Sequence, residues 1–180
     1  MKIAILMGLL LLVGTYFFFS GGSVTAPEWG NLNAASSTTS TATRVAPDGQ
    51  KEFRSEQYKF SLFYPQDFTV QEFDEGNGAR TFVFGDEKHE RGFQVFVIPY
   101  AQEQVDRERF LLDSPSGVMK ESIDVLIDGA KGTIFFGKNG IMGDTREAWF
   151  IRGGFLYEVT TYKDLDAWLG GIMQTWHWLP

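Results

Sequence analysis

Residues 145–180 read TREAWFIRGGFLYEVTTYKDLDAWLGGIMQTWHWLP and carry the clearest folding signals of the chain. Two apolar-rich runs, Ala148–Ile151 and Phe155–Tyr162, flank Gly153-Gly154. Because glycine tolerates the positive φ angles of tight turns, this pattern predicts a β-hairpin.

A helical pattern follows the hairpin directly. Its apolar side chains recur every three or four residues and form one stripe: Leu165, Trp168, Leu169, Ile172, Met173 and Trp176. We therefore expect a helix that covers the sheet, with Trp168 and Leu169 against the strands. This unit indicates architecture and leaves the chemistry open.

The composition excludes several classes of function. The 180-residue chain has a formal net charge of −7, so it lacks the basic surface of a nucleic-acid-binding protein. It contains no cysteine, which excludes disulfides, thiolate catalysis and cysteine-based zinc sites. With 17 Phe and 5 Trp, the core is expected to be dense in aromatic rings.

The N-terminus predicts a single-pass membrane anchor over residues 1–22. An apolar run from Ile3 to Phe19 is just long enough to cross a bilayer as a helix. Lys2 is the only basic side chain before Arg44. The positive-inside rule therefore places the N-terminus in the cytoplasm and the rest of the chain outside.

A cleaved leader, which would release a secreted protein, is the alternative. Val24–Ala26 has the small-x-small form of a cleavage site, but Pro27 would follow the cut and disfavour it. Ser20–Gly22 offers a second site. Both alternatives place the rest of the chain outside the cytoplasm.

Residues 23–50 are predicted to form a flexible, Ser/Thr-rich linker. Ala34–Thr43 is of low complexity and offers nothing large to bury, so nothing offsets the entropy of ordering it. Trp29 is a lone aromatic residue in this segment, and we assign it no role. Residues 51–180 then form one globular domain that is large enough for its own core.

Alternating apolar residues and turn signals predict a succession of strands within this domain. Asp74–Gly78 and Asp128-Gly129 mark two further hairpin turns. Phe93–Ile98 is apolar on both faces, which is typical of a central strand covered from both sides. The other strands are expected over Phe60–Tyr64 (ended by Pro65), Phe68–Phe73, Thr81–Phe84, Ile123–Ile127 and Gly132–Phe136.

A short helix is expected over Asp106–Asp113. Asp106 is its predicted N-cap, and Phe110 with Leu111 or Leu112 is expected to face inward. Because hairpins dominate the connections, we predict an α+β fold with a mainly antiparallel sheet and helices packed on it.

The order of these motifs resembles the PsbP-like domain of the Mog1/PsbP fold. Phe60–Pro65 is similar to the family's opening strand, Phe155–Tyr162 to a late strand, and Leu169–Trp178 to its closing segment. The resemblance covers Tyr58 to Leu179 and implies an α/β/α sandwich around an antiparallel sheet. Similar plant proteins are extrinsic subunits of photosystem II, and the Mog1 branch binds a small GTPase. The membrane leader and Ser/Thr-rich spacer argue against the GTPase-binding role, and the lack of a Ser- and Arg-rich transit peptide argues against the thylakoid role. The family implies no catalytic residues.

The search for a metal site yields one weak candidate. His89 lies among Asp86, Glu87 and Glu90, and imidazole with carboxylates suits zinc or manganese. The sequence nevertheless lacks the second histidine of the metalloprotease motif. A solvated, charged hairpin loop is the simpler interpretation.

Other candidate sites are also better explained by structure. Gly132–Asn139 has the spacing of a phosphate-binding loop, but Asn139 replaces the Ser or Thr that would hold Mg²⁺, and the interior is typical of a strand. His177, between two tryptophans, is expected to face outward from a terminal strand. Glu158 is interpreted as a single acid on the outward face of a strand, and we identify no pair of buried acids suited to a glycosidase.

Two features leave alternatives open. The glycine-rich stretch Gly137–Gly143 is either a mobile contact loop or a long connection that tucks Ile141 and Met142 beneath it. Four tryptophans either line a ligand groove or belong to the core: Trp149, Trp168, Trp176 and Trp178.

These observations favour a non-catalytic, membrane-tethered extracytoplasmic domain that binds an unknown protein partner or supports an envelope assembly. No catalytic, cofactor-binding or metal-binding residue is predicted. The alternative is a small-ligand- or solute-binding domain with a pocket between sheet and helix, and a hydrolase is least favoured. A pocket with convergent polar groups would favour ligand binding. A buried acid–histidine pair would favour a hydrolase. A flat surface with an exposed apolar patch would favour a protein partner.

Overall fold

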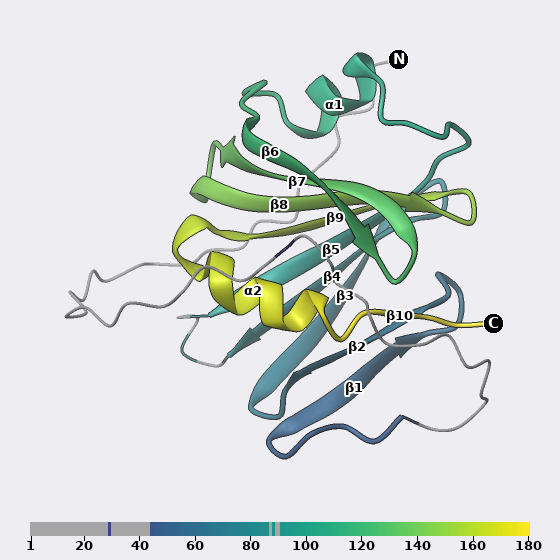
Figure 1. The fold of residues 1–180 in the computed structure, drawn as a ribbon, viewed down its shortest axis with the longest axis vertical. Helices are drawn as coiled ribbons and strands as arrows, with labels where there is room; N and C mark the ends of the chain where they lie inside the picture. Colours follow the sequence, from purple (N-terminus) through teal and green to yellow (C-terminus); the bar gives the residue numbers. More distant parts are fainter. Residues whose placement is uncertain (1–28, 30–43, 87, 89–90) are drawn as a thin grey trace.

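The computed structural model describes Trp29 and residues 44–86, 88 and 91–180, which form two sheets and two short α-helices (Figure 1). The larger sheet has the spatial order β3 (Phe68–Gly76), β4 (Ala79–Asp86), β5 (Gly92–Pro99), β9 (Phe155–Tyr162), β8 (Gly143–Arg152), β7 (Ala130–Asn139) and β6 (Lys120–Ile127). The smaller sheet has the order β1 (Gln50–Ser55), β2 (Phe60–Pro65) and β10 (His177–Trp178). All neighbouring strands are antiparallel, so the predicted mainly antiparallel α+β fold is confirmed.

The three predicted hairpins are present. The central φ angles are 53° and 80° at Asn77-Gly78, 45° and 80° at Asp128-Gly129, and 61° and 83° at Gly153-Gly154. Positive φ at both central residues matches the twist of the flanking strands, as in type I′ turns. The first turn is tighter than predicted, because β3 continues through Gly76.

The prediction of a long loop over Gly137–Gly143 is wrong. Strand β7 continues to Asn139 and β8 begins at Gly143, which leaves a turn of only three residues. The side chain of Asn139 closes this turn, because its Oδ1 accepts hydrogen bonds from the amides of Ile141 (2.7 Å) and Met142 (3.1 Å). Ile141 is 62% exposed and therefore does not tuck beneath the chain.

An aromatic core fills the space between the two sheets. Phe60 of β2 stacks on Trp176 with ring centroids 4.4 Å apart, and Phe84 of β4 stacks on Phe93 of β5 at the same distance. Helix α2 (Asp166–Met173), which follows the 3₁₀ turn η2 (Lys163–Leu165), packs on β2 and β9 beside this core. The expected density of aromatic rings is confirmed.

Helix α2 is shorter than the apolar stripe that predicts it. The helix ends at Met173, and the Thr175 hydroxyl accepts a hydrogen bond from the amide of Phe63 at 2.8 Å, which turns the chain toward β10. Trp176 lies beyond the helix but is still buried. Trp168 remains partly exposed and packs on Phe68, with ring centroids 5.7 Å apart, so the expected contact with the strands is confirmed.

Helix α1 (Arg107–Asp113) covers part of the opposite face of the larger sheet. The predicted N-cap is correct: Asp106 Oδ1 accepts a hydrogen bond from the amide of Arg109 at 2.7 Å. Phe110 faces inward, with its ring centroid 5.5 Å from that of Trp149. The expectation that a leucine joins it is wrong, because Leu111 and Leu112 are both exposed.

The implied α/β/α sandwich is only partly realised. One face of the larger sheet is covered by the smaller sheet together with α2, and the other face carries only the short helix α1 and its flanking segments. Strand β5 illustrates the asymmetry. Phe93, Val95 and Val97 are buried toward the aromatic core, whereas Gln94 and Phe96 on the other face stay partly exposed. The prediction of cover on both sides therefore holds for only part of this strand.

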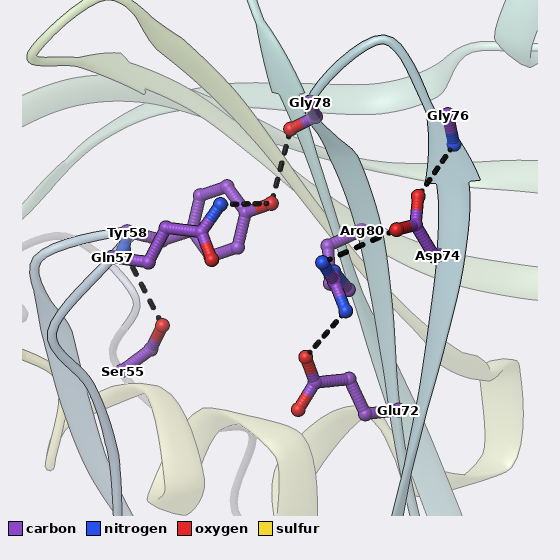
Figure 2. A network of polar contacts seen from close by, with 8 residues as sticks. All are labelled: Ser55, Gln57, Tyr58, Glu72, Asp74, Gly76, Gly78 and Arg80. Atoms are coloured by element: carbon purple, nitrogen blue, oxygen red, sulfur yellow. Dashed lines mark hydrogen bonds and ion pairs between the residues drawn. The ribbon is translucent and has the colours of Figure 1, made fainter.

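A polar network fastens the turn between β1 and β2 to the tip of the β3–β4 hairpin (Figure 2). The Tyr58 hydroxyl donates to the carbonyl of Gly78 at 3.0 Å. The Tyr157 hydroxyl, from β9, donates to the carbonyl of Tyr58 at 2.7 Å. Arg80 bridges Glu72 (2.8 Å) and Asp74 (3.4 Å) on the neighbouring strand. The hydrogen bonds of Tyr58 and Tyr157 join the two sheets, whereas the Arg80 ion pairs brace β3 and β4 within the larger sheet.

Several described residues of the predicted linker contact the domain, including Gly49, whose carbonyl accepts a hydrogen bond from the amide of Gln66, and Gln50, which begins β1. Trp29 is only 5% exposed and belongs to the aromatic core, and the Arg146 guanidinium lies 5.2 Å from its ring centroid. Arg44 stacks over Phe63 at 4.2 Å and donates to the carbonyl of Thr175. The leader and the rest of the linker lie outside the described residues. Within the described residues, no helix has the length and apolar character needed to cross a membrane.

Candidate ligand groove

A cavity of about 890 Å³ opens beside α1, on the same face of the larger sheet, where the helix leaves the strands uncovered. The end of α1 and the following segment, Leu112–Ser116, form one wall, and the β7–β8 turn forms another. Its floor is the sheet itself. This position arises because β3, β4 and β5 extend beyond the reach of a helix of seven residues.

The register of the β8–β9 hairpin brings two acids onto the floor of this groove. Glu147 lies opposite Thr160, and Trp149 lies opposite Glu158. Side chains two residues apart along a strand share a face, so all four point to the same side of the sheet. Glu147 is 9% exposed and Glu158 is 5% exposed.

The carboxyl group of Glu147 is enclosed by hydrogen-bond donors. Its Oε2 accepts from Thr160 Oγ1 at 2.6 Å and from Trp149 Nε1 at 3.3 Å. Burial raises the pKa of Glu147, and the hydrogen bonds from Thr160, Thr145 and Trp149 oppose this shift without cancelling it. The neutral form of the acid is therefore favoured beyond its ordinary pH range.

Glu158 is more strongly perturbed. Burial raises its pKa well above the ordinary value, and the nearby carboxyl of Asp113 raises the pKa further, whereas Arg109 lowers it. Arg109 and Asp113 form an ion pair along α1. Oε1 of Glu158 is buried, and no N–H or hydroxyl group of the described residues donates a hydrogen bond to it.

The rest of the groove combines aromatic and polar side chains. Phe73 and Phe96 present rings, while Gln71 and Gln94 present amides from the same face of the sheet. This mixture of apolar surface and convergent polar groups is typical of small-molecule sites.

The interpretation of Glu158 as an outward-facing single acid is wrong. It is buried and has Glu147 as a partner, so the chain does contain a pair of buried acids. The signal was present in the sequence, because a turn at Gly153-Gly154 fixes which residues of the hairpin lie opposite each other. The burial itself depends on α1, and no local pattern predicts that contact.

The other predicted candidates do not form a site in the described structure. His89, Glu87 and Glu90 lie outside the described residues. Asp86 is described and lies 3.6 Å from Arg91 in an ion pair. Among the described residues, no group of three acids or histidines is placed to hold a metal ion. Gly132–Asn139 lies within β7, which confirms its interpretation as a strand.

His177 and the four tryptophans lie in different parts of the fold. His177 is partly exposed on β10, as expected, and its Nδ1 lies 3.2 Å from Asp128 Oδ2, a partner that the sequence did not indicate. Trp149 lines the groove, whereas Trp176 and Trp178 belong to the aromatic core. Trp168 packs at the edge of that core.

Comparison with known proteins confirms the fold alone. The solution structure of cyanobacterial PsbP (CyanoP) from Synechocystis sp. PCC 6803 matches with a TM-score of 0.53 over 78% of this chain and 98% of that chain. Sequence identity between the two is 10%. No family model and no curated protein matches the sequence. The PsbP-like fold expected from the motif order is therefore confirmed.

Proposed function

We propose that this protein is a non-catalytic binding domain, held outside the membrane by its N-terminal leader, that takes a small ligand in the groove beside α1. The observation that carries the proposal is the groove itself, with the buried carboxyl groups of Glu147 and Glu158 on its floor. A PsbP-like fold is consistent with such an accessory role.

The two acids support binding more than hydrolysis. Acid–base catalysis by a carboxyl pair needs one neutral and one ionised group, so their pKa values must be shifted apart. Here burial raises the pKa of both Glu147 and Glu158, more strongly at Glu158, and neither acid has a net shift to lower pKa that would hold it ionised. The described histidine, His177, lies on β10 with its Nδ1 3.2 Å from Asp128 Oδ2, and it is not among the residues that line the groove.

A groove-filling substitution tests the proposal. Val83 lines the groove from β4, so Val83→Trp should occupy the space and abolish binding of small aromatic and polar fragments in saturation-transfer NMR. Lys131→Trp places the same ring at an exposed position of β7 outside the groove and should leave binding unchanged. Equal fragment binding by both variants would contradict the proposal.

A protein partner remains the second candidate function. Exposed apolar side chains occur on α1, on β6 and between them: Leu111, Leu112, Met119, Ile123 and Leu126. Exposed apolar side chains that form a contiguous patch are common at protein interaction surfaces. Crosslinking in the native membrane from a position on β6 should capture a specific protein if this surface is used, and Lys51 on β1 provides a control position.

The membrane tether has its own test. The proposal requires the intact chain to sediment with membranes and the domain to be cleaved by protease added from outside the cytoplasm. Recovery of the intact chain in the cytoplasmic fraction would refute it.

A further inference from the structure

We infer that the groove selects ligands with a cationic amine end, whose ammonium group lies against Glu158 and Glu147 while an apolar body extends along the sheet. This inference rests on the proposed ligand-binding function and specifies its chemistry. It is carried by the charge of the groove, by the buried oxygen of Glu158 and by the aromatic side chains along the sheet.

The groove has an excess of acidic side chains. The described lining residues include five carboxyl groups, those of Glu75, Asp86, Asp113, Glu147 and Glu158, and two basic groups, those of Arg91 and Lys138. Arg91 lies in ion pairs with Asp67 (3.4 Å) and Asp86 (3.6 Å), and Lys138 is exposed at the rim. A cation that reaches this floor favours ionisation of Glu147 and Glu158, whereas an anion opposes it, so the excess of acids selects for cations once these carboxyl groups ionise.

The floor also offers a hydrogen-bond acceptor. Oε1 of Glu158 is buried, and it receives no hydrogen bond from an N–H or hydroxyl group of the described residues. Its carboxyl neighbour Asp113 can share a proton with it only while one of the two acids is protonated. An ammonium group carries three donors and forms charge-assisted hydrogen bonds with carboxylates.

The walls suit the rest of such a ligand. Phe73, Phe96 and Trp149 line the groove together and can contact an apolar chain or ring. Aromatic faces also attract ammonium groups through cation–π interactions. A volume of about 890 Å³ is ample for a small amine of this kind.

Amine binding should release a proton. In the empty groove, burial and the neighbouring acids Asp113 and Glu147 raise the pKa of Glu158 and favour its protonated form. Arg109 opposes this shift. An arriving ammonium group favours the carboxylate form of Glu158. The acid therefore loses its proton to solvent, and the resulting carboxylate forms an ion pair with the ammonium group. Affinity should therefore rise with pH until Glu158 is already ionised in the empty groove.

Three probes with the same phenylethyl body test the selectivity: 2-phenylethylamine, 2-phenylethanol and 3-phenylpropanoate. Isothermal titration would use the full chain in nanodiscs of zwitterionic lipid, with empty nanodiscs as the blank. The amine should bind at least about tenfold more tightly than the alcohol, and the carboxylate should bind least. Titration in two buffers of different ionisation enthalpy should detect the released proton.

Matched variants locate the effect. Glu158→Gln and Glu147→Gln keep the size of each side chain, and each should weaken amine binding about tenfold while alcohol binding stays unchanged. Glu56→Gln removes the same charge from an exposed position outside the groove and should have no effect. Near-ultraviolet circular dichroism confirms that each variant is folded.

The outcomes separate the inference from the function on which it rests. Equal binding of all three probes, displaced by Val83→Trp, would overturn the amine selectivity and keep the groove as a ligand site. Binding of none of the probes by the folded chain would overturn both. Tighter binding of Nα-acetyl-lysine amide than of 2-phenylethylamine would support the ammonium chemistry and assign its source to a protein side chain.

Discussion

Glu158 is the residue whose environment departs most from what its sequence context suggests. It lies in the apolar run Phe155–Tyr162, where an acid is expected to point to solvent. Instead α1 covers it and places Asp113 beside it, so burial and a like charge both raise its pKa. Its ionisation must therefore oppose folding.

Stability should fall as pH rises through the titration of Glu158. In the unfolded chain this carboxyl ionises near its ordinary pKa, while in the folded protein it stays protonated to higher pH, so the unfolded state loses its proton first. Glu158→Gln cannot ionise. The variant should match the wild type near pH 4 and exceed its free energy of unfolding at neutral and higher pH, as measured by urea denaturation.

The charge-matched control for this experiment is Glu56→Gln, which is exposed and should follow the wild-type pH dependence. Parallel curves for the wild type and Glu158→Gln would show that this carboxyl is solvated in the folded protein.

At the scale of single elements, α1 is the element on which the groove depends. It contributes the groove wall and the Asp113 carboxyl, yet it has only seven residues, none of which is buried as a whole residue. A helix this short is not stable by itself, so its cap and the contacts of Phe110 hold it in place.

Loss of the cap should therefore loosen this helix. Asp106→Ala removes the acceptor for the amide of Arg109 and should lower the free energy of unfolding by about 1 kcal/mol. Hydrogen–deuterium exchange should accelerate at residues 109–113. Glu108→Ala changes an exposed acid in the same turn without removing the cap, so equal effects of the two substitutions would contradict this role.

The elements also show which signals the sequence contains. Hairpin turns were predictable because Asn-Gly, Asp-Gly and Gly-Gly pairs impose the backbone angles themselves. The same signal fixes the β8–β9 register, which places Glu147 and Glu158 on one face, but this pairing was not predicted. The burial of that face, the second sheet and the closure of the β7–β8 turn by Asn139 were not predictable, because each depends on contacts that no local pattern specifies.

At the scale of the whole molecule, the largest departure from the sequence prediction is Trp29. The Ser/Thr-rich composition predicts a segment with little to bury, yet the Trp29 side chain from this segment is buried. Trp29 lies in the aromatic core beside Arg146, which also pairs with Asp166 of α2 at 2.8 Å.

Trp29 should contribute measurably to stability. Trp29→Ala is expected to lower the free energy of unfolding by about 3 kcal/mol, because a buried ring is lost and its site is left partly empty. A chain that begins at Arg44 should lose about as much. A Trp29→Ala variant as stable as the wild type, beside a destabilised truncation, would show that other residues of the segment provide the contact.

If the chain is anchored in a membrane as proposed, the attachment of Trp29 would also set how far the domain can stand from the bilayer. Counted from Phe19, the last residue of the apolar run in the proposed anchor, an untethered chain up to Arg44 would have a contour length of about 85 Å. Fixation at Trp29 shortens the contour length of this connection to about 35 Å, which is less than half. The domain would then sample only a thin layer above the lipid headgroups, and its groove would meet solutes close to the bilayer surface.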